Sequence, residues 1–191
     1  MSNIFDTIAD VIKSRRTVKP FMMNGQKIPD EQINQLLELA DWAPTHGLTE
    51  PWRFLVYKNP ADFCHQHAEM YRNATHPDDF AEGVYANLKS QGDKASHVII
   101  AMMKRGSLPK IPAFEEMAAV SCAVENLLLG ATALGIASYW GTGGMILKPE
   151  MKDFLDLGDD DEVIGVLYFG YADNAPEGKR ITPLSQKVRW A

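Results

Sequence analysis

Two adjacent arginines near the start of the chain are the residues best suited to hold an anion. Arg15 and Arg16 stand between Ser14 and Thr17. Each guanidinium group presents a planar fork of N–H donors that matches two phosphate oxygens, and Thr17 adds a neutral donor. Two arginines at a helix end also complement its dipole, and taken alone this simpler interpretation is the better one. A phosphate site therefore needs support from elsewhere in the chain.

The residues before the two arginines are expected to form a helix that presents both of them at its end. The apolar residues Ile4, Ile8, Val11 and Ile12 recur at helical spacing. This spacing predicts a helix with one apolar stripe that ends at the arginines.

The segment from Ala43 to Phe54 carries a second group of unusual residues. A helix that begins near Pro29 is expected to stop before Pro44, because proline disfavours helix at the residue before it. A short polar loop with His46 follows, and Pro51 opens an apolar strand.

The rest of the chain mixes helices and strands without a repeat or a separating linker. This irregular order favours an α+β fold with a sheet of mixed direction over a doubly wound one. A polar helical segment at 61–94, interrupted at 75–79, would cover one edge and contribute to a lid. Strands are expected at 52–57, 97–103, 135–140 and 163–169, and later helices at 114–134 and 149–155.

Together these segments resemble the flavin-dependent nitroreductase family. The motifs are Ser-Arg-Arg-Thr at 14–17, Trp-Ala-Pro-Thr-His at 42–46, Glu-Pro-Trp-Arg-Phe at 50–54 and Tyr-Trp-Gly-Thr-Gly at 139–143. The resemblance spans most of the chain. It implies one compact FMN-binding domain over residues 1–191, folded as a three-layer sandwich whose mixed, mostly antiparallel sheet is flanked by helices.

The resemblance also implies where the FMN phosphate binds. It would lie against Arg15, Thr17 and Arg16, near the end of the first helix. In this family a basic C-terminal pair commonly joins the phosphate, and Lys179 and Arg180 occupy that place here.

By the same resemblance, Trp140, Gly141 and Thr142 would lie along the isoalloxazine ring, with a backbone amide near its N5 edge. His46 would reach the flavin of the other subunit, so the resemblance predicts a homodimer. Trp42 stands where some relatives place an arginine near the cofactor, and its contact is therefore either stacking or absent.

The helix expected at 114–134 has two interpretations. It is rich in small side chains, which let another helix come close. The segment from Ala118 to Leu128 would form the main dimer contact under the resemblance, or the ordinary core of a monomer without it.

The glycines at 141–144 do not form a dinucleotide fingerprint. Ile146 stands where the third glycine of Gly-x-Gly-x-x-Gly is required. Without the resemblance, a flexible turn and a backbone surface for a flat heterocycle are equally good interpretations of this loop.

No metal site is expected. Cys64, His65, His67, Glu69 and His76 are close in sequence, but no second paired motif completes a set of four ligands.

The composition is that of an ordinary globular protein. The 191 residues are 46% apolar and 23% charged, and the net charge of −6 argues against broad nucleic-acid binding. The apolar stretch at 117–136 contains Glu125 and Asn126, so a buried helix is expected rather than a membrane span. Two cysteines and no recognisable secretion signal favour a cytoplasmic location.

The resemblance implies an oxidoreductase that moves a hydride from NADH or NADPH to a small acceptor such as a nitroaromatic or a quinone. No catalytic side chain is expected, because FMN supplies the reactive centre. Donor and acceptor would use one site in turn, by a ping-pong mechanism. One alternative is a flavin-binding or flavin-sequestering protein with little turnover. Another is an interaction domain without flavin, in which Arg15 and Arg16 are ordinary surface charges.

Overall fold

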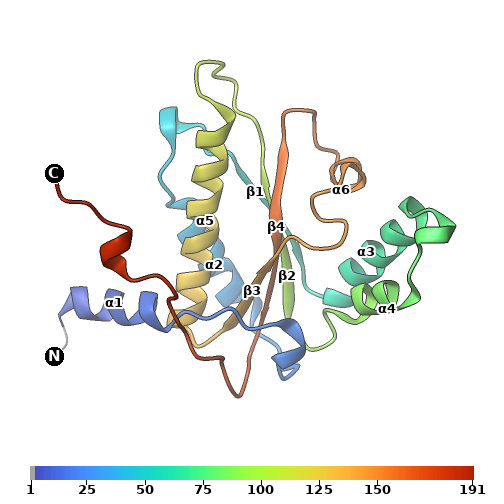
Figure 1. Cartoon of the computed structure of the whole chain (residues 1–191), viewed down its shortest axis with the longest axis horizontal. Coiled ribbons are helices and arrows are strands. Elements are labelled where there is room, and N and C mark those ends of the chain that lie inside the picture. Colours follow the sequence, from blue (N-terminus) through green and yellow to red (C-terminus); the bar gives the residue numbers. More distant parts are fainter. Residues whose placement is uncertain (1–2) are drawn as a thin grey trace.

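A four-stranded sheet lies at the centre of the computed structural model, which describes residues 3–191 (Figure 1). The strand order is β1-β2-β4-β3, and the neighbouring strands are antiparallel. A short parallel bridge between Thr17 and Ser138 adds to the edge of β3, so the sheet is mixed and mostly antiparallel, as expected. The strands are β1 (Trp52–Tyr57), β2 (His97–Met103), β3 (Ala137–Gly141) and β4 (Glu162–Gly170).

Helices cover both faces of the sheet and give the predicted three layers. Figure 1 shows α2 and α5 on one face, and α3, α4 and α6 on the other. The α-helices are α1 (Ile4–Ser14), α2 (Asp30–Asp41), α3 (Pro60–Ala74), α4 (Glu82–Ser90), α5 (Ala113–Ala133) and α6 (Pro149–Phe154). Short 3-10 helices are η1 (Pro20–Met22), η2 (His46–Leu48), η3 (Pro77–Asp79) and η4 (Leu184–Gln186).

Strand β2 is central because it is apolar on both sides. All 7 of its residues are buried. Val98 and Ile100 pack into the core beneath α3 and α6, whereas Ile99 and Ala101 pack into the core beneath α2 and α5. The continuous apolar run therefore marks a strand covered on both faces, which confirms the prediction.

Helix α5 packs closely on α2 through small residues. Ala119 is buried in this core, and a Cβ atom added at Gly130 would lie 2.7 Å from Cδ1 of Leu39. On the same helix, Phe114 and Met117 are exposed. The inner face of α5 is therefore part of the core, and its outer face is exposed. Among residues 3–191, no helix combines the length and hydropathy needed to cross a bilayer.

Strand β3 begins two residues later than the pattern predicts. Gly135 adopts a φ of +71°, and the Ile136 N–H donates to the Ala131 carbonyl oxygen at 2.8 Å. These features close α5, and positive φ is a conformation that glycine adopts readily. Gly135 and Ile136 therefore belong to the end of the helix rather than to the strand.

Helix α1 and the C-terminal segment after residue 171 lie outside the layered body (Figure 1). Asn3 caps α1, because its Oδ1 accepts from the Asp6 N–H at 2.8 Å. None of the residues of α1 is buried, and Ile4 and Phe5 are 80% and 76% exposed. The predicted helix is confirmed, but its apolar stripe faces solvent in the single chain.

Candidate functional site

The arginine segment is joined to strand β3. Thr17 forms a parallel bridge with Ser138, and the Val18 N–H donates to the Ser138 carbonyl oxygen at 2.9 Å. Ser138 lies on the strand that leads to Trp140 and Gly141. Two parts of the predicted site that are far apart in sequence are therefore neighbours in space.

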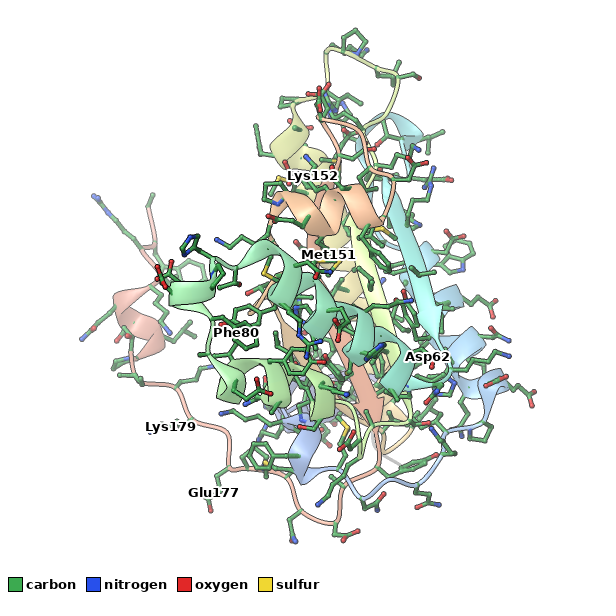
Figure 2. All side chains as sticks on the ribbon, turned by 90° about the vertical axis from the view of Figure 1, so that its right-hand side faces the viewer. Asp62, Phe80, Met151, Lys152, Glu177 and Lys179 are labelled. Carbon is green, nitrogen blue, oxygen red and sulfur yellow. The ribbon has the colours of Figure 1, made fainter. Side chains whose placement is uncertain are left out.

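The C-terminal segment crosses the same place. A Cβ atom added at Gly178 would overlap the guanidinium group of Arg16, so the backbone there passes directly against that side chain. Lys179 follows on this extended segment (Figure 2), and both Lys179 and Arg180 are exposed. The structure thus brings the segment with the predicted C-terminal pair to the N-terminal arginines.

Both arginines are oriented by neighbouring groups. Arg16 donates from Nη1 to the carbonyl oxygens of Lys13 and Arg15, at 2.6 and 2.9 Å. Nε of Arg15 lies 3.8 Å from Oε1 of Glu125 on α5. Half-exposed ion pairs of this kind contribute little stability. Glu125 therefore lies beside Arg15 without burying its guanidinium group.

We call Arg15, Arg16 and Thr17, with the adjoining Lys179 and Arg180, the basic corner. A groove opens beside it, between η1, α4 and β3. Its outer part has a volume of about 420 Å³ and is lined by Lys19, Asn87, Gln91 and Tyr139 among others. Its inner part, of about 110 Å³, shares Asn87, Gln91 and Tyr139 and reaches the Gly141–Gly144 loop. Because the two hollows share three lining residues, we call them together the α4 groove.

Sequence reasoning missed Lys19, Asn87 and Gln91. Lys19 lies two residues beyond Thr17, and the parallel pairing with β3 is what carries it to the groove. Asn87 lies on α4 and Gln91 is its C-cap, and their spacing of four residues puts them on one side of the helix. That spacing is a signal for a shared role, but no sequence pattern indicates that α4 comes near β3.

Tyr139 and Trp140 face opposite sides of the sheet, as neighbours in a strand do. Tyr139 lines the α4 groove. Trp140 packs on the face covered by α2 and α5, and its Nε1–H donates to the Ile164 carbonyl oxygen at 3.2 Å. Gly165 makes room for it, because a Cβ atom there would overlap the indole ring. Of these two neighbours, Tyr139 therefore borders the groove and Trp140 does not, and Phe21 and Tyr168 add further aromatic side chains to its wall.

The loop after β3 is fixed by His67 of α3. The Met145 N–H donates to His67 Nε2 at 2.9 Å. Gly144 has a φ of +66°, and a Cβ atom there would lie 2.8 Å from the same nitrogen. The imidazole is 2% exposed, and its Nδ1 has no hydrogen-bond partner among the described residues. Burial lowers the pKa of His67 to about 4, so the ring is neutral at neutral pH.

His46 lies away from the basic corner of its own chain. On η2, its Nδ1 is 2.6 Å from Oε2 of Glu115, in the first turn of α5. Arg15 meets the same helix at Glu125, which is about 15 Å further along at 1.5 Å per residue. Within one chain, His46 and Arg15 therefore do not meet.

Trp42 also lies apart from the other predicted residues. It caps the C-terminal end of α2 and is 81% exposed. It lines a separate surface hollow of about 370 Å³ with Leu39 and Leu134, and no other predicted site residue lines that hollow.

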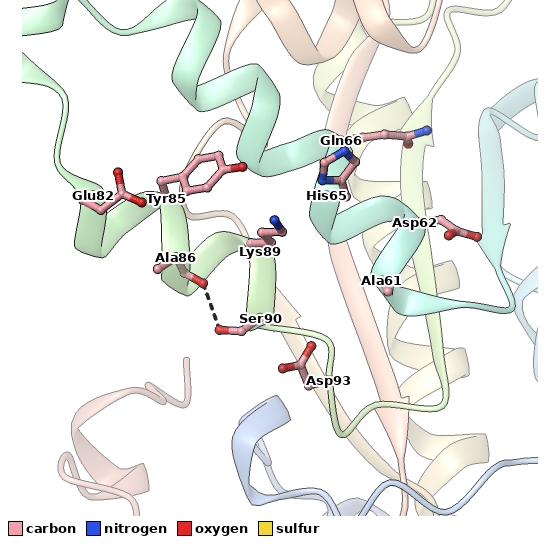
Figure 3. Close-up of a pocket in the computed structure, with 10 residues that line it drawn as sticks. All are labelled: Ala61, Asp62, His65, Gln66, Glu82, Tyr85, Ala86, Lys89, Ser90 and Asp93. Atoms are coloured by element: carbon pink, nitrogen blue, oxygen red, sulfur yellow. Dashed lines mark hydrogen bonds between the residues drawn. The ribbon is translucent and has the colours of Figure 1, made fainter.

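A larger hollow, of about 910 Å³, lies between α3 and α4 (Figure 3). Its wall mixes acidic side chains such as Asp62 and Glu82 with the basic side chains of His65 and Lys89. None of the residues predicted for the site lines it. Size alone therefore does not identify the functional site.

The cysteine and histidine run on α3 is distributed among different surroundings. Cys64 is buried with its Sγ 4.0 Å from the Tyr168 hydroxyl, and His67 holds the glycine loop. His65 borders the outer hollow. Within residues 3–191, no three His, Cys, Asp or Glu side chains are grouped so as to hold a metal ion.

The model of the nitroreductase family matches residues 12–171 of the chain. The chain belongs to the nitroreductase family. The matched residues run from α1 to the end of β4, and they include the arginine segment, the His46 loop and β3. The predicted oxidoreductase class is therefore confirmed.

Relatives and solved structures agree with this family. The Bacillus subtilis protein named "Putative NAD(P)H nitroreductase YfhC" is 27% identical over 183 residues, which cover 94% of this chain and 92% of that protein. A nitroreductase-like family protein from Bacillus cereus has a TM-score of 0.81 at 26% identity, and covers 100% of this chain and 99% of its own. A nitroreductase from Bacteroides fragilis, solved with bound FMN, has a TM-score of 0.70 at 23% identity, with 100% of both chains covered. These similarities confirm the nitroreductase-like fold.

We expect the free energy of unfolding to fall as the pH drops from about 6.5 to about 4. In this window the histidine of the unfolded chain binds a proton that buried His67 does not, so acid favours the unfolded state. The contribution of His67 to this loss of stability should reach about 3 kcal/mol. Denaturant unfolding at several pH values measures it. His67→Gln should remove this contribution to the pH dependence, whereas His65→Gln, at an exposed position, should not. Equal slopes of unfolding free energy against pH in all three proteins would contradict the buried, neutral state of His67.

Proposed function

We propose that this chain binds FMN and moves a hydride from NADH or NADPH to a small acceptor such as a nitroaromatic or a quinone. The observation that carries the proposal is the pairing of Thr17 with Ser138, because it joins a basic corner to a groove with a polar wall. The FMN bound to the Bacteroides fragilis relative and the NAD(P)H in the name of the Bacillus subtilis relative support it.

The phosphate of FMN would lie at the basic corner. Arg15, Arg16 and Thr17 provide two guanidinium groups and a hydroxyl, which are suited to a doubly charged oxyanion. Lys179 and Arg180 follow the backbone that crosses Arg16 and add two more positive charges. Since the whole chain has a net charge of −6, this corner is a local positive region.

The flat ring of FMN would lie in the α4 groove. Lys19, Asn87 and Gln91 offer an ammonium group and two amides to the polar edge of the heterocycle. Oε1 of Gln91 already accepts from the Tyr168 hydroxyl at 3.2 Å, so its amide NH₂ is left to donate. The backbone at 140–142 would lie along the ring, with an N–H near its N5 edge.

Bound FMN would supply the redox centre, so the chain has to supply binding, orientation and exclusion of water. No side chain in the groove is assigned as a nucleophile or as a general acid. Donor and acceptor would occupy the same position over the ring in turn, and this arrangement predicts ping-pong kinetics.

Exposed apolar side chains support a homodimer. They lie on α1, on the outer face of α5 and on the C-terminal segment, and Ile4, Phe5, Phe114, Ile181 and Trp190 are between 68% and 93% exposed. Burying a large apolar side chain gains about 1.5–3 kcal/mol, so a surface of this kind favours association with a second copy.

The separation of His46 from Arg15 also favours a site shared between two chains. His46 meets α5 about 15 Å from Arg15 and lines neither part of the α4 groove, so its contact with FMN would come from the other subunit. Any contact from exposed Trp42 would likewise cross the subunit interface.

We assign residues 1–191 to one domain and place the protein in the cytoplasm. Both cysteines are free thiols, with Cys64 buried and Cys122 exposed, and free thiols fit a reducing compartment. The acidic net charge favours small-molecule partners over nucleic acid.

The purified protein is expected to be yellow and to bleach rapidly when NADH or NADPH is added without oxygen. A nitroaromatic or a quinone should then restore the absorbance, and double-reciprocal plots at several acceptor concentrations should be parallel. A yellow protein that bleaches only over hours would identify the flavin-sequestering alternative. A colourless protein whose melting temperature does not change when FMN is added would exclude both the proposed enzyme and the flavin-sequestering alternative.

Replacing Arg15 with alanine should weaken FMN binding by about 2 kcal/mol, or roughly 30-fold, because a charge-assisted contact to phosphate is lost. Flavin fluorescence titration measures the dissociation constant. Arg72→Ala is the matched control, since Arg72 also forms an ion pair with a glutamate but lies on α3. Unchanged affinity in Arg15→Ala would put the phosphate elsewhere.

Replacing Ile8 with glutamate should convert the dimer to a monomer while keeping helix content, because it puts a charge in the apolar stripe of α1. Sedimentation velocity measures the change in mass. Asp10→Lys alters charge on the polar side of the same helix and should leave the dimer intact. A wild-type protein that sediments as a monomer would refute the shared site.

A further inference from the structure

His67 links helix α3 to the backbone of the loop after β3. Its Nε2 accepts the Met145 N–H at 2.9 Å, and it approaches Gly144 so closely that a Cβ atom there would lie 2.8 Å from it. The same side chain lines the inner part of the α4 groove together with Gly141 and Gly143. A change at His67 therefore acts directly on the loop that borders the groove.

The loop needs such an anchor because of its composition. Glycines at 141, 143 and 144 have no side chains to pack, and glycine loses the most backbone freedom on ordering. The hydrogen bond from Met145 to His67 ties the end of this glycine stretch to the layer of helices.

The contact depends on the protonation state of the ring. Because Nε2 accepts from a backbone N–H, the neutral ring carries its proton on Nδ1. A protonated imidazole has donors at both nitrogens and cannot accept at either. The Met145 N–H would then face another donor, and the loop would lose its hydrogen bond to α3.

The surroundings of the ring keep it neutral. Phe63 of α3 lies 5.4 Å away between ring centroids, and Leu88 of α4 borders the same hollow. The titratable neighbours there are Tyr139 of β3 and Tyr168 of β4, and burial raises the pKa of Tyr168. Glu69, two residues along α3, is engaged by the Tyr85 hydroxyl at 2.6 Å. Desolvation therefore determines the protonation state of this ring.

We infer that His67 is a positioning residue for the flavin: its neutral ring holds residues 141–145 in the shape that receives FMN, and acid releases that loop. The inference rests on the FMN site proposed above. It assigns a role in cofactor retention to helix α3, outside the basic corner.

Substitutions separate the role of the hydrogen-bond acceptor at His67 from the role of the size of its side chain. His67→Phe keeps a flat ring but has no acceptor for the Met145 N–H, and it should raise the FMN dissociation constant about 10-fold. His67→Gln offers an amide oxygen at a similar reach and should restore affinity to within a few-fold of wild type. His65→Phe, on the exposed side of α3, is the control. Equal affinity in His67→Phe and wild type would overturn the inference.

The pH profile gives a second test that does not require His67→Phe to fold. Wild-type FMN affinity should fall as the pH approaches about 4 from neutral. His67→Gln has no proton to take up, so its profile should be flatter than that of wild type. Parallel profiles in the two proteins would overturn the inference.

A spectroscopic test uses the protein without FMN and separates this inference from the proposed function. Nitrogen-15 NMR of the imidazole should show Nε2 without a proton and Nδ1 with one at neutral pH. The opposite tautomer would overturn the inference even if FMN binds. If wild-type protein fails to bind FMN, the proposed function and the positioning role both fail, whereas the tautomer still reports whether the loop is anchored as described.

Discussion

The backbone pairing of residues 17 and 18 with Ser138 is the contact on which the rest of the site depends. None of the residues of helix α1 is buried, so its end is held by the chain that follows it, where Val18 is buried and its N–H donates to the Ser138 carbonyl oxygen. This pairing brings the arginines to the edge of the sheet and puts Lys19 in the α4 groove. The β3 edge of the sheet thus positions both the basic corner and the polar wall of the α4 groove.

The sheet can serve as this support because its centre is buried on both faces. Strand β2 is apolar throughout and is covered by α2 and α5 on one side and by the layer of α3 and α6 on the other. That second layer also shapes the site, since α4 and its C-cap supply Asn87 and Gln91, and α3 supplies His67. The polar segment expected to cover an edge therefore forms one wall of the groove.

Periodicity predicted most of the elements, because the apolar stripe of α2 and the apolar run of β2 reflect burial directly. The basic corner was predicted from family motifs, because Arg16 or Lys179 taken alone does not distinguish a phosphate site from an ordinary surface charge. Asn87, Gln91 and His67 were not predicted, because their roles depend on how α3 and α4 pack beside β3. The pairing of His46 with Glu115 likewise joins residues that are far apart in sequence and has no signature in either segment.

The exposed stripe of α1 and the exposed Trp190 at the other end of the chain have a thermodynamic consequence. In the proposed homodimer, segments that are covered only when two copies meet would be stabilised by mass action, so their order would depend on how much protein is present. Dilution would loosen both ends of the chain at once, and these are the ends that bring Arg16 and the backbone at Gly178 together. Retention of a bound anion would then vary with the concentration of the protein itself.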